Sequence, residues 1–349
     1  SQARCTAPPA PPAPLGPAAA ALGDRAHTVG GEPLAPPAHS GRWPAPGMQP
    51  AGPRPRYGEH SKMLPVMVVA ATIVSLYVLY VEVHGARLMQ WDLPSVARNA
   101  ALREQGALEL TAFHIVTALL MYCLIRCILT NPGTIPDGQG WEIQADTQDH
   151  GPLARGVNET KTSGDRRHCK WCLKYKPDRC HHCRVCNMCV LRMDHHCPWV
   201  YNCIGFRNHK YFFLLLLYAA VDLNLIFWTM FSTVWWSTRV EVPIFMMFVM
   251  VLGEAFVGFL TVATVMFLGF HLWLMSRAMT TVEFCEKSLQ HAGYDRSKYS
   301  TGLYGNVCAV LGPRPMLWLL PVSLPEGNGM TWPIAAGPKT AEQRRASVT

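Results

Sequence analysis

The sequence predicts an α-helical polytopic membrane protein, with four transmembrane helices and a cytosolic cysteine-rich domain between the second and third helices. Four apolar runs each have about the twenty residues that a bilayer core requires. Eight of the thirteen cysteines and four of the fourteen histidines lie within residues 169–203, between the second and third runs. Basic residues are concentrated in the same loop, which the positive-inside rule places in the cytosol.

The four predicted spans are residues 63–84, 107–129, 211–236 and 246–274. The second contains Glu109 and His114 near its start and Arg126 near its end, where a long side chain can reach the interface. The third ends in a Trp pair suited to the membrane interface. The fourth belongs to an apolar stretch, 242–275, that is longer than one span needs, so part of it lies in the turn or continues as helix beyond the bilayer.

The segments outside the spans differ in composition. Residues 1–62 are dominated by Pro, Ala and Gly and cannot bury enough apolar surface to offset chain entropy, so they are expected to form a disordered cytosolic tail. The loop 130–210 holds the cysteine-rich domain, with its core at 167–208. A cytosolic segment at 275–324 and a second disordered tail at 325–349 complete the chain. Four spans place both termini on one face, with the basic loop.

The cysteine-rich segment could be built by disulfides or by zinc. Disulfide frameworks belong to small secreted domains, whereas Cys-x-x-Cys steps interleaved with histidines on a cytosolic surface are typical of tetrahedral zinc sites. Cys169 and Cys172 form one such step, and the cysteines within 180–189 form a ladder of the same spacing. The spacing therefore predicts zinc, but it leaves open which sulfur atoms share an ion.

Two four-ligand zinc sites would leave one or two thiols over. A spare Cys197 beside His195, with Asp194 just upstream, would have the parts of an activated nucleophile: a thiol, a base and an orienting carboxylate. Alternatively, Cys197 is another ligand and Asp194 is a solvated charge. Spacing alone leaves both alternatives open.

The segment resembles the cysteine-rich domain of the DHHC protein S-acyltransferases, or palmitoyltransferases. Asp194-His195-His196-Cys197 stands at the position of their signature tetrad. The resemblance extends over further short motifs, which are Lys176-Pro177-Asp178-Arg179, His181-His182-Cys183, Pro198-Trp199-Val200, Asn202-Cys203, Gly205 and Asn208.

This resemblance implies two closed, four-ligand Zn²⁺ sites that fold the domain and take no part in the chemistry. The first ligand set would be Cys169, Cys172, His182 and Cys189. The second would be Cys183, Cys186, His196 and Cys203. Cys180 would be a passenger and Cys197 the nucleophile, with His195 as its base and Asp194 orienting that base.

Motifs outside the loop also match the family. Thr280-Thr281-Val282-Glu283 resembles its Thr-Thr-x-Glu motif, which implies a hydrogen bond from Thr281 to Asp194. The segment around Asn306 resembles a C-terminal motif whose Asn pins the chain near the site. Asn131 replaces the Asp of an Asp-Pro-Gly motif, which keeps a turn plausible but puts any carboxylate role there in doubt.

The implied enzyme is a protein-cysteine S-palmitoyltransferase that works by a ping-pong mechanism through an acyl thioester on Cys197. Palmitoyl-CoA, or another long-chain acyl-CoA, would be the co-substrate, and cytosolic cysteines of membrane-associated proteins would be the acceptors. Burying each acyl methylene in the bilayer is worth about 0.8 kcal/mol, so a cavity between the spans could hold the acyl tail while Cys197 lies at the interface.

Contacts to the acyl group and to CoA are also expected. Trp199 and Tyr211 are candidate wall residues, and Asp222 could limit chain length at the far end of the cavity. Basic residues that could meet the CoA phosphates are Lys176, Arg179, Arg192 and Lys210. Alternatively, these residues are ordinary surface charge on a cytosolic loop, and Asp222 has a polar partner or lies near the lumenal edge.

We expect a multi-pass protein of an endomembrane (Golgi or ER) or of the plasma membrane, with its active site and both termini in the cytosol and no nucleic-acid partner. The alternative function is a catalytically inactive, zinc-stabilised membrane adaptor or scaffold. The intact tetrad and the Thr-Thr-x-Glu match argue against it. A zinc-dependent ubiquitin ligase would need a longer, cross-braced ligand spacing.

Overall fold

The structure is a computed structural model that describes residues 63–138, 140–143, 157–161, 166–289, 298–322 and 325–333. The predicted N-terminal tail, 1–62, and the last part of the C-terminal tail, 334–349, lie outside these residues. Their disorder therefore stays a prediction.

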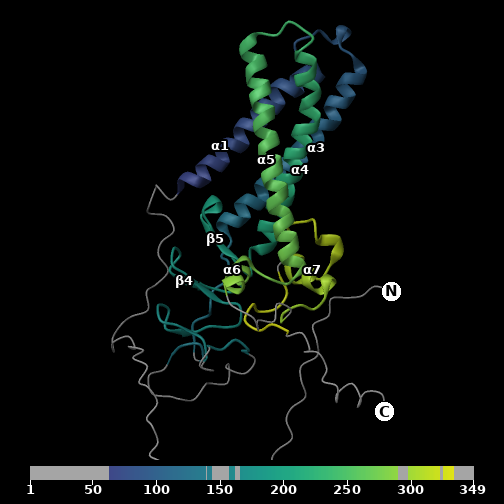
Figure 1. The fold of residues 1–349 in the computed structure, drawn as a ribbon. Helices are drawn as coiled ribbons and strands as arrows, with labels where there is room; N and C mark the ends of the chain where they lie inside the picture. The colour runs from purple at the N-terminus through teal and green to yellow at the C-terminus, as the bar shows by residue number, and fades with distance from the viewer. Residues whose placement is uncertain are drawn as a thin grey trace, which may run out of the picture. The chain divides into compact units, whose positions relative to one another are not determined.

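The described part of the chain contains four helices that are long and apolar enough to cross a membrane (Figure 1). The first, Leu64–Met89, consists of α1 (Leu64–Leu79), the π-helical segment η2 (Tyr80–Gly85) and α2 (Ala86–Met89). The other three are α3 (Ala100–Leu129), α4 (His209–Ser237) and α5 (Ile244–Ser276). Each helix extends beyond the apolar run that predicted it, at one end or at both.

The start of α3 shows why the helices are longer than the apolar runs. The Asn99 side chain accepts a hydrogen bond from the Leu102 amide at 3.2 Å and so caps the helix seven residues before the predicted span begins. Thirty residues of α-helix measure about 45 Å, which exceeds the hydrocarbon thickness of about 30 Å. The first turns of α3 therefore extend past a bilayer core.

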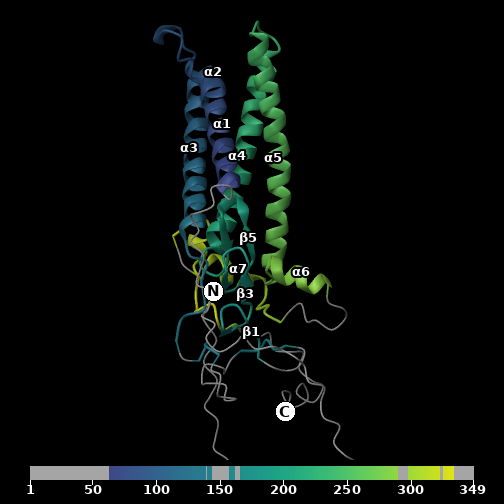
Figure 2. The ribbon, with the colours of Figure 1, turned by 90° about the vertical axis from the view of Figure 1, so that its left-hand side faces the viewer.

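The long helices contact one another through both small and polar residues. α4 packs against α3 and α5, and Figure 2 shows α4 and α5 side by side. Gly253 of α5 lets that helix approach α1, because a Cβ atom there would lie 2.5 Å from Leu79. Between η2, α3 and α4, the two ring nitrogens of the buried His84 lie 2.7 Å from the Thr233 hydroxyl and 2.6 Å from the Glu109 carboxylate.

The cysteine-rich domain consists of three two-stranded antiparallel hairpins. These pair β1 (His168–Cys169) with β2 (Lys174–Tyr175), β3 (His181–Cys183) with β4 (Met188–Val190), and β5 (His195–Cys197) with β6 (Asn202–Ile204). An isolated hairpin of two or three residues per strand is not stable in water. Something other than strand pairing must therefore hold this domain together.

The β5–β6 hairpin is fixed to the end of α3. The Asn202 side chain donates to the Cys127 and Thr130 carbonyls at 2.8 and 2.9 Å, which satisfies carbonyls that a helix end leaves unpaired. In the following turn, the Asn131 side chain accepts from the Gly133 amide at 2.8 Å. Asn131 therefore forms this turn through its amide oxygen, without a carboxylate.

Short helices and a C-terminal segment complete the fold. The short helices are η3 (Ser95–Ala97), η5 (Pro198–Val200), α6 (Thr281–Leu289), α7 (Leu303–Leu311) and η6 (Pro315–Leu317). Composition predicted disorder from residue 325, but in residues 325–333 the Trp332 ring lies 5.0 Å from the Arg179 guanidinium and 5.1 Å from that of Arg192. An aromatic ring stacked with two buried cations orders this part of the predicted tail.

Candidate active site and metal centres

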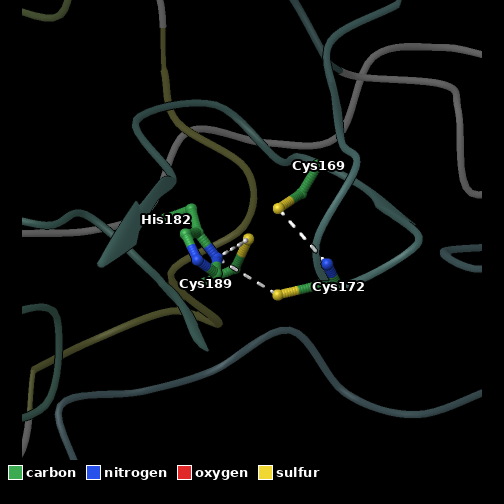
Figure 3. Close-up of side chains that lie close together, drawn as sticks. All are labelled: Cys169, Cys172, His182 and Cys189. Atoms are coloured by element: carbon green, nitrogen blue, oxygen red, sulfur yellow. Dashed lines mark hydrogen bonds between the residues drawn. The ribbon is translucent and has the colours of Figure 1, made fainter. Parts of the chain in front are cut away.

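Four potential metal ligands converge between the first two hairpins. Figure 3 shows their side chains pointing toward one another: Cys169, Cys172, His182 and Cys189. The His182 Nδ1 atom lies 3.3 Å from the Cys172 sulfur and 4.0 Å from the Cys189 sulfur. Hydrogen bonds from the neighbouring thiols lower the pKa of Cys169, and the Cys172 amide donates to the Cys169 sulfur at 3.4 Å.

A second group of four ligands joins the second and third hairpins: Cys183, Cys186, His196 and Cys203. The His196 Nδ1 atom lies 3.7, 3.4 and 3.6 Å from the three sulfurs in that order. The Cys203 and Cys186 sulfurs are 3.4 Å apart. As in the first group, hydrogen bonds from the other thiols lower the pKa of Cys183.

Both groups fit zinc by their geometry and donor chemistry. A tetrahedral ion with Zn–S bonds of about 2.3 Å and Zn–N bonds of about 2.0–2.1 Å places two sulfurs about 3.8 Å apart, and a sulfur and a nitrogen about 3.6 Å apart. The observed separations lie within a few tenths of an ångström of these values. Three thiols and one imidazole form a closed structural site, so each group would cross-link two hairpins that are unstable alone. These are the two ligand sets that the family resemblance implied.

Strand β5 presents the metal ligand His196 on one face and the residues His195 and Cys197 on the other. Alternate residues of a strand face opposite sides, so His195 and Cys197 share one face while His196 points to the ligands of the second group. The His195 Nδ1 atom donates to the Asp194 Oδ2 atom at 2.6 Å, and the Cys197 thiol is close enough to the same ring to raise the pKa of His195. Asp194, His195 and Cys197 thus form a connected carboxylate–imidazole–thiol chain, with Cys197 in neither ligand group.

The Asp194 carboxylate accepts two hydrogen bonds from the first residue of α6. The Thr281 amide donates to Asp194 Oδ1 at 3.0 Å, and the Thr281 hydroxyl donates to Oδ2 at 2.9 Å. The second of these is the hydrogen bond that the Thr-Thr-x-Glu resemblance implied. Burial acts to raise the pKa of Asp194, but the His195 hydrogen bond and the nearby imidazoles lower it below the usual range of Asp. Asp194 is therefore a buried carboxylate.

His195 responds to the same environment. Burial alone would lower its pKa, but the hydrogen bonds to Asp194 and Cys197 outweigh burial and raise the pKa to about 9. Its ring is also held edge-on against Phe212 of α4, with the ring centres 5.0 Å apart. His195 is consequently held in a fixed orientation beside a thiol, in surroundings that favour its protonated form.

The Thr-Thr-x-Glu segment forms a capping box at the start of α6. The Thr280 hydroxyl accepts from the Glu283 amide at 3.3 Å, while the Glu283 carboxylate accepts from the Thr280 amide at 3.0 Å. The Val282 amide donates to the Asp194 carbonyl at 3.1 Å. Every free amide of the first turn thus has a partner, and the side chain and backbone of Asp194 supply two of them.

The thiol of Cys197 lies where the hairpins meet the ends of the long helices. Its buried side chain belongs to an apolar cluster that includes Cys127 of α3, Phe213 of α4 and Leu268 of α5. A thiol at this place is next to helices of membrane-spanning length and also next to the polar hairpins. This is the environment that an amphiphilic substrate requires.

Several known proteins are similar to this chain in sequence. A family model for DHHC palmitoyltransferase matches residues 162–288. The palmitoyltransferase ZDHHC15 of Xenopus laevis is 34% identical over 289 residues, which cover 78% of this chain and 81% of the relative. ZDHHC15A of Danio rerio is 31% identical over 291 residues, which cover 78% of this chain and 84% of the relative. ZDHHC2 of Mus musculus is 33% identical over 258 residues, which cover 67% of this chain and 68% of the relative. The chain belongs to the DHHC palmitoyltransferase family.

As a DHHC palmitoyltransferase, the chain has protein S-acyltransferase activity. The structure corrects one expectation about its CoA contacts. Arg179 is 2% exposed and donates to both carboxylate oxygens of Glu283, at 2.6 and 2.9 Å, so it cannot meet a CoA phosphate. Arg192 and Lys210 are buried as well, and each donates to a backbone carbonyl. Lys176 is half-buried.

The other candidate residues of this palmitoyltransferase lie in different surroundings. Trp199 is 55% exposed, whereas Tyr211 is buried and its hydroxyl accepts from Arg126 at 3.0 Å. Asp222 accepts from the Thr117 hydroxyl at 3.1 and 3.3 Å, so it has the polar partner that one alternative expected. Asn306 donates to the Ser276 carbonyl at 2.9 Å and so ties α7 to the end of α5.

Sequence reasoning missed two residues near the tetrad. His209 of α4 and His271 of α5 both lie against the Asp194 carboxylate. His271 has aromatic and aliphatic neighbours in an apolar run, and His209 stands between Asn208 and Lys210, just before another such run. No spacing signal in the sequence marks either residue.

Proposed function

We propose that this palmitoyltransferase moves a long-chain acyl group from acyl-CoA to protein cysteines through a thioester on Cys197. One observation carries the assignment of the nucleophile. Among the clustered cysteines, Cys197 lies outside both four-ligand groups and shares a strand face with an imidazole that a buried carboxylate orients.

In the first half-reaction, His195 takes the Cys197 proton and the Cys197 sulfur attacks the thioester carbonyl of acyl-CoA. The bond from the carbonyl carbon to the CoA sulfur breaks, and CoA leaves as a thiol with the proton from His195. In the second half-reaction, the acceptor cysteine attacks the acyl-enzyme in the same way and regenerates the Cys197 thiol. Exchange of one thioester for another is nearly balanced in energy, so the enzyme supplies mainly positioning and proton transfer.

The two metal groups support this chemistry indirectly. Cys169, Cys172, His182 and Cys189 would hold one zinc ion, and the ligand group around His196 would hold the other. Bound zinc supplies cross-links and no reactive ligand position, because each group already offers four donors. The ligand His196 lies between His195 and Cys197 in sequence, so a fixed His196 also fixes the strand that carries both.

The acyl chain is proposed to lie among the long helices, next to Cys197. Each buried methylene contributes about 0.8 kcal/mol, and the cluster around Cys197 is apolar. Trp199, which is exposed, and Tyr211 would border the entrance. The Asp222–Thr117 pair lies about 20 Å along α4 from His209 and would limit the length of the chain. Lys176 remains a candidate for contact with the CoA phosphates.

The basic loop supports an orientation with the active site and both termini in the cytosol. In that orientation acyl-CoA and cytosolic cysteines of membrane-associated proteins both reach Cys197. The membrane would be an endomembrane (Golgi or ER) or the plasma membrane.

Metabolic labelling with an alkyne-bearing palmitate analogue tests this function. We expect a hydroxylamine-sensitive label on the full-length protein, which disappears in the variant Cys197→Ser. The matched control is Cys285→Ser, because Cys285 is an exposed cysteine of α6 outside both metal groups, and this variant keeps the label. An unlabelled wild-type chain that retains its zinc would instead support the inactive adaptor.

A further inference from the structure

Two histidines from the long helices flank the catalytic carboxylate. His209 is the first residue of α4, and His271 lies near the end of α5. One nitrogen of each ring and a carboxylate oxygen of Asp194 all lie within 4.8 Å of one another. The His209 Nε2 atom is 4.0 Å from Asp194 Oδ1.

Both imidazoles are buried with few polar neighbours. His209 is 7% exposed and His271 is 4% exposed. The Nδ1 atom of His209 has no hydrogen-bond partner among the residues that the structure describes. The polar group nearest to the other nitrogen, Nε2, is the Asp194 carboxylate. Burying an imidazole without a compensating interaction is unfavourable, and an apolar residue would fill the same space at lower cost. The position therefore indicates a use for the ring N–H.

The His271 ring is held in one orientation by aromatic neighbours. Its centre lies 5.0 Å from Phe212, 4.7 Å from Phe267 and 5.5 Å from Phe270, each in an edge-on arrangement. The His271 and His195 ring centres are 6.1 Å apart. Of the three imidazoles, His195 is the one whose pKa the Cys197 thiol shifts, and His195 also contacts Asp194 directly. An effect of His209 and His271 on the thiol therefore runs through Asp194 and His195.

We propose that His209 and His271 are positioning residues that hold the Asp194 carboxylate in line with His195 while His195 carries the proton from Cys197. This inference rests on the proposed function. Preoriented N–H dipoles near a buried charge stabilise it without reorganisation during the reaction. Asp194 would then be held from four sides, by His195, by Thr281 and by one residue from each of α4 and α5. The packing of the two helices beside the proposed acyl site would thus be coupled to the catalytic chain.

The test measures acylation of Cys197 by palmitoyl-CoA in purified full-length protein. The variant His209→Phe keeps a ring but removes the N–H group, and we expect its maximal rate to fall about 10- to 100-fold with KM unchanged, as for the loss of one interaction with a charged group. The variant His209→Gln places an amide nitrogen near the former Nε2 position and should recover most of the rate. His271→Phe should show the same loss as His209→Phe.

The control is His84→Phe, which removes another buried histidine of the long helices. His84 contacts Thr233, which lies about 36 Å along α4 from His209, so this variant should keep the maximal rate of the folded protein. Zinc content and melting temperature, measured for every variant, normalise the rate to folded protein. If His209→Phe does not fold, His209→Gln should still acylate and His271→Phe decides the question.

Full maximal rates in both Phe variants would overturn the inference, as would an equal loss in His84→Phe or a folded but inactive His209→Gln. A wild-type protein that is not acylated would refute the proposed function itself, and this result is separate from any difference among the histidine variants.

Discussion

The buried ion pair between Arg179 and Glu283 allows a sharp test of how α6 is held against the cysteine-rich domain. The side chains are 2% and 5% exposed, and the guanidinium donates to both carboxylate oxygens. The substitution Glu283→Gln removes the charge with little change of shape. Because Gln also serves in a capping box, this variant keeps the cap of α6 and isolates the ion pair.

Removing one partner of a buried ion pair destabilises a protein by about 3–5 kcal/mol, because the other charge stays buried. We expect the lower end, about 3 kcal/mol. Arg179 keeps its bond to the Ala278 carbonyl at 2.7 Å and its contacts with the Tyr299 and Trp332 rings at 4.8 and 5.0 Å. At about 2 °C per kcal/mol for a chain of this size, the melting temperature should fall by about 6 °C.

The assay is thermal unfolding of the zinc-loaded protein in detergent, with the double variant Arg179→Met/Glu283→Gln as the matched control. Arg179→Met removes the charge that Glu283→Gln leaves unpaired, so the double variant should regain most of the lost stability, because the main cost of breaking a buried pair is the uncompensated charge. A single variant that melts with the wild type, or a double variant that melts below the single one, would refute this reasoning.

Three further outcomes are expected. Thr281→Val should slow acylation about 10-fold by removing the hydroxyl bond to Asp194, whereas Thr281→Ser, which keeps it, should not; equal rates would contradict this role. Cys186→Ser should leave one bound zinc ion per chain where the wild type binds two, as measured by metal analysis; two retained ions would contradict the ligand assignment. Trp332→Ala should destabilise the protein by about 1–2 kcal/mol through loss of two cation–π contacts, and Trp332→Phe by less; unchanged melting would exclude this stacking.

Local patterns predicted much of this molecule. The apolar runs located four long helices, and the Cys-x-x-Cys steps located the metal groups. The spacing could not show which cysteines bind the same zinc ion, because the Cys-x-x-Cys steps overlap between residues 180 and 189. It came from the family resemblance, which also chose between Cys197 as a ligand and Cys197 as a nucleophile.

The errors concern contacts between distant segments. Arg179 was expected at a surface because basic residues in a polar loop usually remain solvated, yet its partner Glu283 is 104 residues away. Trp332 was assigned to a disordered tail because its neighbours are polar and irregular. Its order depends on Arg179 and Arg192, and no local pattern shows that pairing. For the same reason, the sequence analysis left His209 in the polar loop and His271 in an apolar run, and linked neither of them to Asp194.

Strand β5 limits how this enzyme can be redesigned. Its three residues alternate between the metal side and the reactive side, so none of them can be exchanged to tune one property alone. Attempts to retarget the enzyme toward other acceptor proteins should therefore leave this strand intact. The outer helix surfaces and the segment around Trp332 offer positions where new recognition can be added without disturbing the reactive thiol.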